Sequence, residues 1–263
     1  MRPNTVKQRL QKGESIVNGW VGMSSTLSAE IIGLAGFDCV TVDLQHGMIG
    51  FDAAVPILQT LSGTAAIPLV RVPANDGPQI MRALDAGAYG IICPMISTPD
   101  QAEHFVSACR YPPKGDRSFG PSRGLLYGGA DYYHHADETI LKLAMIETQQ
   151  GLDNLDLILA VDGLDGIFVG PNDLSLALGQ APSSEPTADV VVEAIAHILA
   201  RVQVHGKIPG IFCSSGDAAA MRLTQGFKFV VPGNDANILK QAATAAVNAA
   251  RGQIKMTAAT SGY

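Results

Sequence analysis

Short, continuously apolar runs alternate with segments of helical periodicity along almost the whole chain. Continuous apolar runs of this length predict strands that are buried on both faces, as in a parallel sheet. Glycine marks many of the junctions between the two kinds of segment, for example Gly36, Gly87 and Gly226. The predicted strands are Ser15–Trp20, Cys39–Val42, Ile67–Val70, Gly90–Cys93, Leu143–Ile146, Gly166–Val169, Gly210–Phe212 and Phe229–Val231.

Counted from end to end, about eight strand-then-helix units predict an α/β fold, the (β/α)8 TIM barrel. We expect a single barrel domain over residues 1–263, a length that this fold commonly has. An open, doubly wound sheet is the structural alternative. It is disfavoured because no GxGxxG motif follows the first strand.

The composition excludes several classes of protein. Hydrophobic residues make up 47% of the chain and charged residues 16%, which excludes a disordered chain and predicts a large core. A net charge of −6 without a basic run disfavours a nucleic-acid partner. The four cysteines form no CxxC pair, so we interpret them as core thiols of a reducing compartment: Cys39, Cys93, Cys109 and Cys213.

No targeting or membrane segment is evident in the sequence. The N-terminus lacks the apolar stretch of a signal peptide, and no later run is long and uncharged enough to span a bilayer. We therefore expect a cytoplasmic protein without a membrane partner.

Two segments interrupt the alternation. Residues 111–137 are rich in Gly, Pro and Tyr, and we expect a long rim loop there, in which Arg117 and Arg123 contact a second substrate, solvent or a neighbouring subunit. Residues 255–263 are polar and small, and we expect a frayed tail.

Charged and polar residues directly follow several of the predicted strands. Active sites of barrel enzymes lie at these strand ends, and charged residues next to buried strands are costly unless they are paired or bind a metal. Their concentration at one end of the barrel is the strongest functional signal in the sequence. The residues concerned are Asp43, Gln45 and His46 after the second strand, Arg71 after the third, Glu147 after the fifth, and Gly170, Asn172 and Asp173 after the sixth.

Glu147 and Asp173 follow neighbouring strands, so their carboxylates are expected to converge. Two hard oxygen ligands suit Mg²⁺ or Mn²⁺, with water and substrate filling the remaining positions. Taken singly, Glu147 could be an acid at a helix N-terminus and Asp173 a helix cap. Taken together on adjacent strands, they favour a metal site.

His46 and Arg71 are candidates for acid–base and anion-binding roles. Asp43 precedes His46 by three residues, so its carboxylate could fix the imidazole tautomer. Arg71 could pair with Asp43 or Asp85, or hold a substrate carboxylate with its two-pronged guanidinium. The GPNDLS run predicts a tight turn into a helix, whose free N–H groups suit an anionic oxygen.

Six motifs occur in a fixed order along the chain: AGFDCVTVDLQHG, RVPAND, PMISTPDQAE, RYPPKGDRSFGPSR, MIET and VDGIFVGPNDLSLALG. As an ordered set, they resemble the HpcH/HpaI aldolase family of class II pyruvate aldolases. The resemblance runs from about Gly19 to about Ala250. It implies a metal-dependent lyase like 4-hydroxy-2-oxoheptane-1,7-dioate aldolase or 2-dehydro-3-deoxyglucarate and -rhamnonate aldolases. It also implies a (β/α)8 barrel whose last helix packs on a neighbouring subunit, commonly in a hexamer built from dimers.

The resemblance assigns roles to individual residues. Glu147 and Asp173 match the ligands of the divalent ion, which would be Mg²⁺, Mn²⁺ or Co²⁺. His46 with Asp43 matches the acid–base pair, and Arg71 matches the arginine that holds the pyruvate oxygens. The remaining matches are the carboxylate-binding turn of Gly170, Asn172 and Asp173, and Asp85 as an acid that approaches the histidine from an adjoining subunit.

Two positions depart from the family pattern. Gln45 stands where some members have glutamate, and Met145 stands where some have glutamine. The first change alters the acid–base network, and the second removes a polar contact to the keto acid. Both bear on the substrate rather than on the reaction class.

Three alternatives remain open at this point. A Schiff-base aldolase needs a buried strand lysine, for which Lys142 and Lys228 are the candidates near strands. A citrate-lyase-like acyl-CoA lyase would need a basic patch for the CoA phosphates, and none is evident. A non-catalytic barrel that serves as a binding or assembly subunit is the third.

Overall fold

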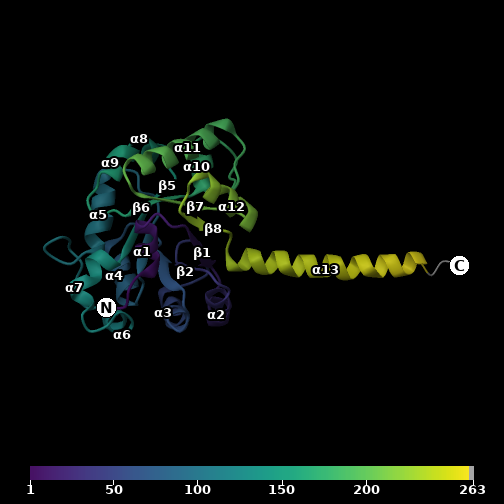
Figure 1. Cartoon of the computed structure of the whole chain (residues 1–263), viewed down its shortest axis with the longest axis horizontal. Helices are drawn as coiled ribbons and strands as arrows, with labels where there is room; N and C mark the ends of the chain where they lie inside the picture. Colours follow the sequence, from purple (N-terminus) through teal and green to yellow (C-terminus); the bar gives the residue numbers. More distant parts are fainter. Residues whose placement is uncertain (261–263) are drawn as a thin grey trace.

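A computed structural model of the chain shows a closed barrel of eight parallel strands surrounded by helices (Figure 1). The structure describes residues 1–260, and only the backbone from residue 253 onward. The strand order follows the sequence from β1 to β8, and β8 pairs in parallel with β1 to close the barrel. The predicted (β/α)8 barrel is therefore confirmed.

The eight predicted strands all form, each within two residues of its expected bounds. The strands are β1 (Ile16–Val21), β2 (Cys39–Asp43), β3 (Ile67–Arg71), β4 (Gly90–Cys93), β5 (Leu141–Ile146), β6 (Gly166–Val169), β7 (Ile208–Phe212) and β8 (Phe229–Val231). The helices are α1 (Thr5–Gln11), α2 (Thr26–Leu34), α3 (Phe51–Leu61), α4 (Gly77–Asp85), α5 (Pro99–Cys109), α6 (Ser122–Gly128), α7 (Tyr132–Thr139), α8 (Gln149–Asp153), α9 (Leu155–Leu159), α10 (Pro171–Ala177), α11 (Asp189–Val204), α12 (Gly216–Gln225) and α13 (Asp235–Thr260).

The core has two parts, one between the strands and the helices and one inside the barrel. Strands buried on both faces supply both parts, which explains their continuous apolar sequences. Inside the barrel, the ring of Trp20 stacks on Phe168 with 5.8 Å between centroids and meets the edge of Phe212 at 5.5 Å. These rings form an aromatic layer near the C-terminal ends of the strands.

Helix α1 closes the opposite, N-terminal end of the barrel. Its Val6 and Leu10 pack into the barrel interior. Lys7 Nζ lies 2.9 Å from Asp165 Oδ1 and donates to the carbonyl of Ile140, and the buried Lys142 approaches the same aspartate. Two lysines thus share one carboxylate. Burial, with the charge of Lys142, lowers the pKa of Lys7 to about 8 despite the opposing effect of Asp165.

We expect Lys7 to make the unfolding free energy depend on pH above neutrality. The pKa of Lys7 is lower in the folded chain than in the unfolded chain, so between about pH 8 and 10 the unfolded chain binds more protons. The unfolding free energy of the wild type should therefore rise by about 1–2 kcal/mol relative to Lys7→Met between pH 7.5 and 9.5. Urea unfolding at the two pH values measures this difference. The exposed Lys12→Met is the matched control, and an equal response of both variants would contradict the prediction.

The segment 111–137 differs from the long loop that the sequence suggests. Helices α6 and α7 occupy much of it, although both are short. Their stability comes from tertiary packing rather than from local propensity: Tyr132 is fully buried, and its hydroxyl accepts a hydrogen bond from the buried Arg117 at 3.0 Å. Because the segment links α5 to β5, it lies at the N-terminal ends of the strands.

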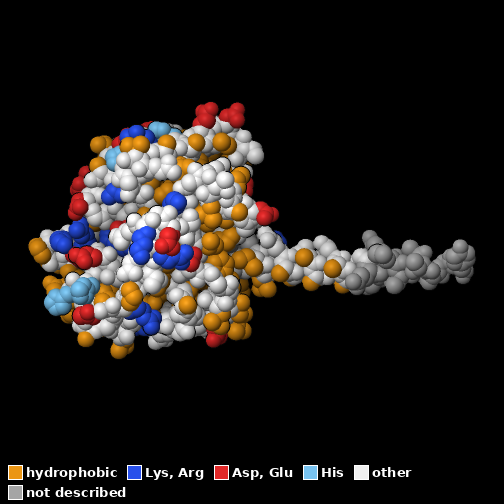
Figure 2. All heavy atoms as spheres, viewed as in Figure 1, with side chains coloured by type: hydrophobic (Ala, Val, Ile, Leu, Met, Phe, Trp, Pro, Cys, Tyr) orange, Lys and Arg blue, Asp and Glu red, His pale blue; other side chains and the backbone are white. Residues whose placement is uncertain are grey.

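Helix α13 leaves the barrel after β8 and projects away from it (Figure 1). Leu239 and Val247 are among its exposed apolar side chains, and hydrophobic side chains gather on the barrel near its base (Figure 2). Packing of α13 on a neighbouring subunit stays a prediction. Of the expected frayed tail, residues 255–260 continue the helical backbone and residues 261–263 lie outside the described residues. Among residues 1–260, no helix is long and apolar enough to cross a membrane.

Candidate active site

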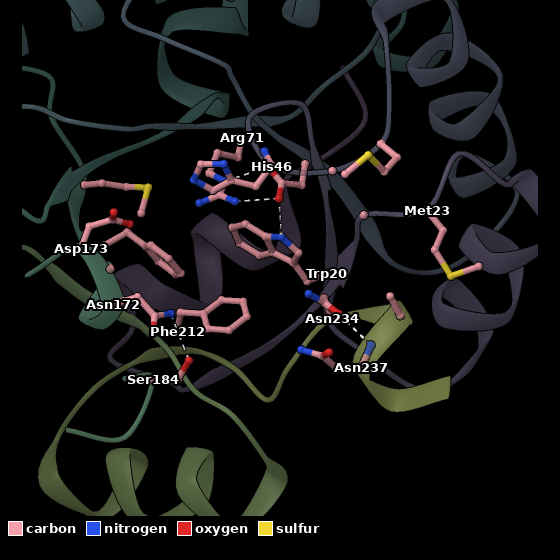
Figure 3. A pocket seen from close by; sticks show the side chains of 18 of the residues that line it. Trp20, Met23, His46, Arg71, Asn172, Asp173, Ser184, Phe212, Asn234 and Asn237 are labelled. Atoms are coloured by element: carbon pink, nitrogen blue, oxygen red, sulfur yellow. Dashed lines mark hydrogen bonds and ion pairs between the residues drawn. The ribbon is translucent and has the colours of Figure 1, made fainter. Parts of the chain in front are cut away.

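A cavity of about 550 Å³ opens at the C-terminal ends of the strands (Figure 3). Residues that follow β1, β2, β6 and β8 contribute to its wall together with strand side chains, as expected for a barrel active site. Six residues predicted from the sequence line it: Asp43, His46, Arg71, Gly170, Asn172 and Asp173.

Asp43 and Arg71 form a buried, two-pronged ion pair. They end neighbouring strands and lie opposite each other in the β2–β3 register. Arg71 Nε donates to Asp43 Oδ1 at 2.8 Å, and Arg71 Nη2 donates to Oδ2 at 2.6 Å. Burial alone would raise the pKa of Asp43, but the hydrogen bonds and charge of Arg71 outweigh it and leave this pKa below its ordinary value. Of the pairings considered from the sequence, the structure has Arg71 with Asp43.

His46 lies at the mouth of this cavity, with its side chain exposed. The structure corrects the expected contact with Asp43: the carboxylate accepts hydrogen bonds from the backbone N–H of Gln45 and His46, at 3.1 and 3.3 Å, and none from the imidazole among the described residues. Asp43 therefore fixes the loop that carries His46. Gln45, one of the departures from the family pattern, has its Oε1 buried without a partner within the described chain.

Glu147 follows β5 and is 2% exposed. Its Oε1 accepts a hydrogen bond from the backbone N–H of Met95 at 2.8 Å. Its Oε2 lies so close to Gly170 that any side chain at position 170 would collide with it. Asp173 lies in the first turn of α10, which Gly170 caps, and it lines the cavity, whereas Glu147 is not among the described residues that line it. Convergence of the two carboxylates on one ion stays a prediction.

Glu147 forms no ion pair with another described residue, and its pKa lies above the ordinary value. Burial is the largest cause, and together with the nearby charge of Asp173 it raises this pKa to about 7, against the opposing effects of the Met95 N–H and Arg71. A buried carboxylate beside a second one is costly unless a cation neutralises the pair. No group of three or more metal-binding side chains occurs within residues 1–260. Two carboxylates with open positions suit a hard divalent ion that keeps water and substrate as ligands.

Sequence reasoning did not single out several residues of the site. Trp20 ends the first predicted strand, and its Nε1 donates to Asp43 Oδ2 at 3.2 Å while Arg71 lies over its ring. Met95 takes a left-handed conformation, with φ of 59°, and presents its N–H to Glu147. Residues at the start of α13 complete the wall. Trp20 could have been predicted as a site residue, since it is a large amphipathic side chain at a strand end. The sequence gives no indication that the backbone of Met95 takes part.

Asp85 lies outside this cavity. It ends α4, toward the N-terminal ends of the strands, and accepts a hydrogen bond from Arg117 Nη2 at 2.8 Å. Arg123 likewise binds the carbonyl of Ala86 and the hydroxyl of Ser62. Neither Arg117 nor Arg123 lines the cavity of its own chain. The substrate contact considered for these arginines is therefore not formed within one chain. A contact of Asp85 with a neighbouring subunit stays a prediction.

The positions of the candidate lysines disfavour Schiff-base chemistry. Lys142 Nζ donates to the carbonyls of Asp137 and Ile140 at the closed end of the barrel. Lys228 precedes β8 and therefore also lies at that end. Among the described residues that line the cavity, none is a lysine.

Asp235 joins two parts of the cavity wall. It is 4% exposed, and its carboxylate accepts hydrogen bonds from the N–H groups of Gly22, Met23 and Ala236 and from the hydroxyl of Ser28. The β1–α2 loop is thereby tied to the first turn of α13. The loop in turn supports the His46 loop, since the Gly22 carbonyl accepts the N–H of Met48 at 2.8 Å.

We expect Asp235→Ala to loosen this wall. Loss of the carboxylate leaves buried N–H donors without a partner, which should lower the unfolding free energy by about 2–3 kcal/mol. It should also raise KM for a ligand of the cavity, because Gly22 and Met23 line it. Denaturant unfolding and steady-state kinetics measure the two effects. Asp217→Ala is the control, because Asp217 is an exposed acid in the first turn of α12, and equal effects of the two changes would contradict the prediction.

Comparison with known proteins agrees with this geometry. The model of the HpcH/HpaI aldolase/citrate lyase family matches residues 18–242. A hydroxypyruvate/pyruvate aldolase of Rhizorhabdus wittichii is 44% identical over 248 residues, covering 94% of this chain and 99% of that protein. A 5-keto-4-deoxy-D-glucarate aldolase of Shigella dysenteriae is 40% identical, covering 91% and 94% of the two chains.

The fold comparison gives the same result. The crystal structure of an HpcH/HpaI aldolase/citrate lyase family protein from Burkholderia cenocepacia superimposes with a TM-score of 0.88 at 30% identity, and the match covers 94% of this chain and 99% of that one. Family model, sequence relatives and solved structure all extend over nearly the whole barrel. This chain therefore belongs to the HpcH/HpaI aldolase/citrate lyase family.

Proposed function

We propose that this chain is a divalent-metal-dependent pyruvate aldolase, which reversibly cleaves a 4-hydroxy-2-oxo acid to pyruvate and an aldehyde. The observation that carries the proposal is the buried carboxylate of Glu147 against Gly170, close to Asp173, which lines one cavity together with the Asp43–Arg71 pair. The family and the aldolases among its relatives support this carbon–carbon lyase activity.

Glu147 and Asp173 are the residues that would hold the metal ion. Mg²⁺, Mn²⁺ and Co²⁺ all accept carboxylate oxygens, and the buried position of Glu147 suits any of them. When bound, such an ion supplies a Lewis acid that polarises the 2-oxo group.

Arg71 would hold the oxygens of the keto acid. Two of its five N–H donors bind Asp43, and the other three are available to a substrate. The ion pair fixes the guanidinium before substrate arrives, so little reorganisation is needed as negative charge develops on the 2-oxo oxygen. The turn formed by Gly170, Asn172 and Asp173 would receive the carboxylate, since first-turn N–H groups have no partner within the helix.

His46 would exchange the proton of the reaction. In the cleavage direction, the 4-hydroxyl gives up its proton, the C3–C4 bond breaks, and its electron pair passes to the three-carbon fragment as pyruvate enolate. The aldehyde leaves, and protonation at C3 gives pyruvate. The exposed position of His46 at the cavity mouth suits exchange with both substrate and solvent, and such a group typically contributes ~10²–10⁴-fold.

An acyl-CoA lyase is less well supported. CoA carries several phosphates, whereas the only cation among the described residues that line the cavity is Arg71, which is already paired with Asp43. A non-catalytic barrel would not explain a buried carboxylate, that of Glu147, close to the acid Asp173 at the C-terminal ends of the strands. We also propose that the chain forms a cytoplasmic homo-oligomer, a hexamer or trimer of dimers.

Removal of the metal tests the proposal. We expect a screen of 4-hydroxy-2-oxo acids, coupled to lactate dehydrogenase, to detect pyruvate with Mg²⁺ or Mn²⁺ present. Chelation should lower the rate at least about a hundredfold, because the developing charge loses its main stabilisation, and adding the ion back should restore it. Turnover that is insensitive to chelator, or trapping of a covalent adduct by borohydride with pyruvate, would contradict the proposed function.

A further inference from the structure

Residues 178–188 connect α10 to α11 without a helix or strand of their own. Within this connecting segment, Ser184 lines the candidate active-site cavity (Figure 3). Ser184 also lines an adjoining cavity of about 590 Å³, and Phe212 and Asn237 are likewise shared by the two cavities. The connecting segment therefore forms part of the boundary between the candidate active site and a second cavity.

Ser184 contacts a residue of the proposed keto-acid site. Asn172 Nδ2 donates to Ser184 Oγ at 3.1 Å (Figure 3). Asn172 belongs to the turn that would receive the carboxylate of the keto acid, and it directly precedes Asp173. Because Asn172 and Ser184 both line the cavity, their hydrogen bond fixes the direction of the Asn172 side chain within the proposed binding site.

Glu185 attaches the connecting segment to the turn after β7. Its Oε1 accepts hydrogen bonds from the backbone N–H of Ser214 at 2.9 Å and from the Ser214 hydroxyl at 3.3 Å. Its Oε2 lies 3.7 Å from Nη2 of Arg222 on α12, whose side chain is 8% exposed. A buried cation needs a counter-charge, and Glu185 is the only ion-pair partner of Arg222 among the described residues. These contacts hold Glu185 in one place.

We propose that Glu185 is a positioning residue, which fixes Ser184 and, through Ser184, orients Asn172 for binding of the keto acid. The inference rests on the proposed aldolase function and adds to it a residue that lies outside the described lining of the cavity. Since Glu185 acts through a binding contact, its loss should weaken keto-acid binding and leave the bond-breaking step largely intact.

Two substitutions of Glu185 separate positioning from stability. Glu185→Ala removes both hydrogen bonds to Ser214, whereas Glu185→Gln can still accept them through its Oε1. We expect Glu185→Ala to raise KM for the 4-hydroxy-2-oxo acid about tenfold with kcat within about threefold of the wild type. Glu185→Gln should restore KM to within about twofold of the wild type. Both variants should unfold at a lower urea concentration, because both leave the buried Arg222 without a counter-charge.

Glu193→Ala is the control, since Glu193 is an exposed acid on α11, and it should match the wild type in KM and in urea unfolding. An equal rise of KM in Glu185→Ala and Glu185→Gln would show that KM merely follows stability, and it would overturn the positioning role. A wild-type KM in Glu185→Ala would overturn it as well.

A double-mutant cycle tests whether Glu185 acts through Ser184. Ser184→Ala removes the hydroxyl that accepts from Asn172, so we expect KM to rise about tenfold. The double variant Ser184→Ala/Glu185→Ala should stay within about twofold of Ser184→Ala alone, because residues of one hydrogen-bond network are not additive. Two effects that multiply to about a hundredfold would show independent action and overturn the proposal.

Binding of pyruvate to the metal-loaded protein gives a readout that does not need turnover. Trp20 is the only tryptophan of the chain and lines the cavity, so its fluorescence reports occupancy. We expect Kd for pyruvate to be about tenfold higher in Glu185→Ala than in the wild type.

The binding and cleavage assays distinguish the two levels of the argument. A wild type that binds pyruvate but cleaves no 4-hydroxy-2-oxo acid would refute the aldolase function, while the ratio of the two Kd values would still decide the role of Glu185. Cleavage by the wild type together with equal Kd values would leave the function standing and refute only the positioning role. A wild type that binds no pyruvate would overturn both.

Discussion

Glu147→Gln is expected to lower kcat/KM for retro-aldol cleavage by at least about a hundredfold, even with excess Mg²⁺ or Mn²⁺. Glutamine has nearly the same shape and can still accept the N–H of Met95 through its Oε1. The change therefore removes a negative charge and an anionic ligand while preserving the packing beside Gly170.

The same variant should be more stable than the wild type when metal is absent. Burial raises the pKa of Glu147 to about 7, above its value in the unfolded chain, so ionisation of this group opposes folding increasingly between about pH 4.5 and 7. Replacing it should raise the unfolding free energy of the metal-free protein by about 1–3 kcal/mol at pH 8. Loss of activity together with a gain in stability excludes misfolding as the cause.

Three measurements complete the experiment: steady-state kinetics, urea unfolding in chelator, and a metal titration followed by the fluorescence of Trp20. Glu193→Gln is the matched control, since Glu193 is an exposed acid on α11. Asp173→Asn should reproduce the loss of turnover. Retention of activity within tenfold in either ligand variant would show that the metal assignment is incorrect.

The strands could be predicted because nearly every strand residue is buried, so continuous apolar runs identify them directly. The 2-residue extension of β5 at Leu141 was missed because Lys142 interrupts the apolar run. The ammonium of Lys142 can be buried because it pairs with Asp165 and donates hydrogen bonds to the carbonyls of Asp137 and Ile140. Hydrophobic periodicity does not reveal such polar partners. Helices α6 and α7 were missed for a related reason, since tertiary contacts such as Tyr132 with Arg117 stabilise them.

The site residues that could be predicted from the sequence are the charged ones that directly follow an apolar strand. The other residues of the site could not. Asp43, Arg71 and Glu147 stand out because an ionised group at a buried position needs a partner. Sequence spacing suggests which groups are neighbours but not which atoms meet, so the contact of Asp43 with the His46 backbone rather than its ring was not foreseen. Neutral residues such as Asn237 carried no signal, because amides are common on helix surfaces.

Arg71→Lys is expected to lower kcat/KM for the keto acid by about a hundredfold or more. Arg71 holds Asp43 through two parallel hydrogen bonds and still presents N–H groups to the cavity. A lysine ammonium is a single charged point that cannot make the paired contact and also reach the substrate oxygens. The 2-oxo oxygen, where charge develops, would lose a fixed donor, and loss of one such donor typically costs 10²–10³-fold in rate.

Lysine is preferable to an apolar replacement because it keeps a positive charge beside the buried Asp43. Arg71→Met would leave that carboxylate unpaired and could unfold the barrel, which would obscure the kinetic effect. Arg82→Lys is the control, since Arg82 also lies over an aromatic ring, that of Phe51, but outside the cavity. The Arg71 variant should unfold within about 2 kcal/mol of the wild type and retain metal binding, with the loss confined to keto-acid binding and cleavage. If both arginine variants keep kcat/KM within fivefold of the wild type, Arg71 serves only to hold Asp43 and the His46 loop in place, and the 2-oxo group must be stabilised by other groups in the cavity.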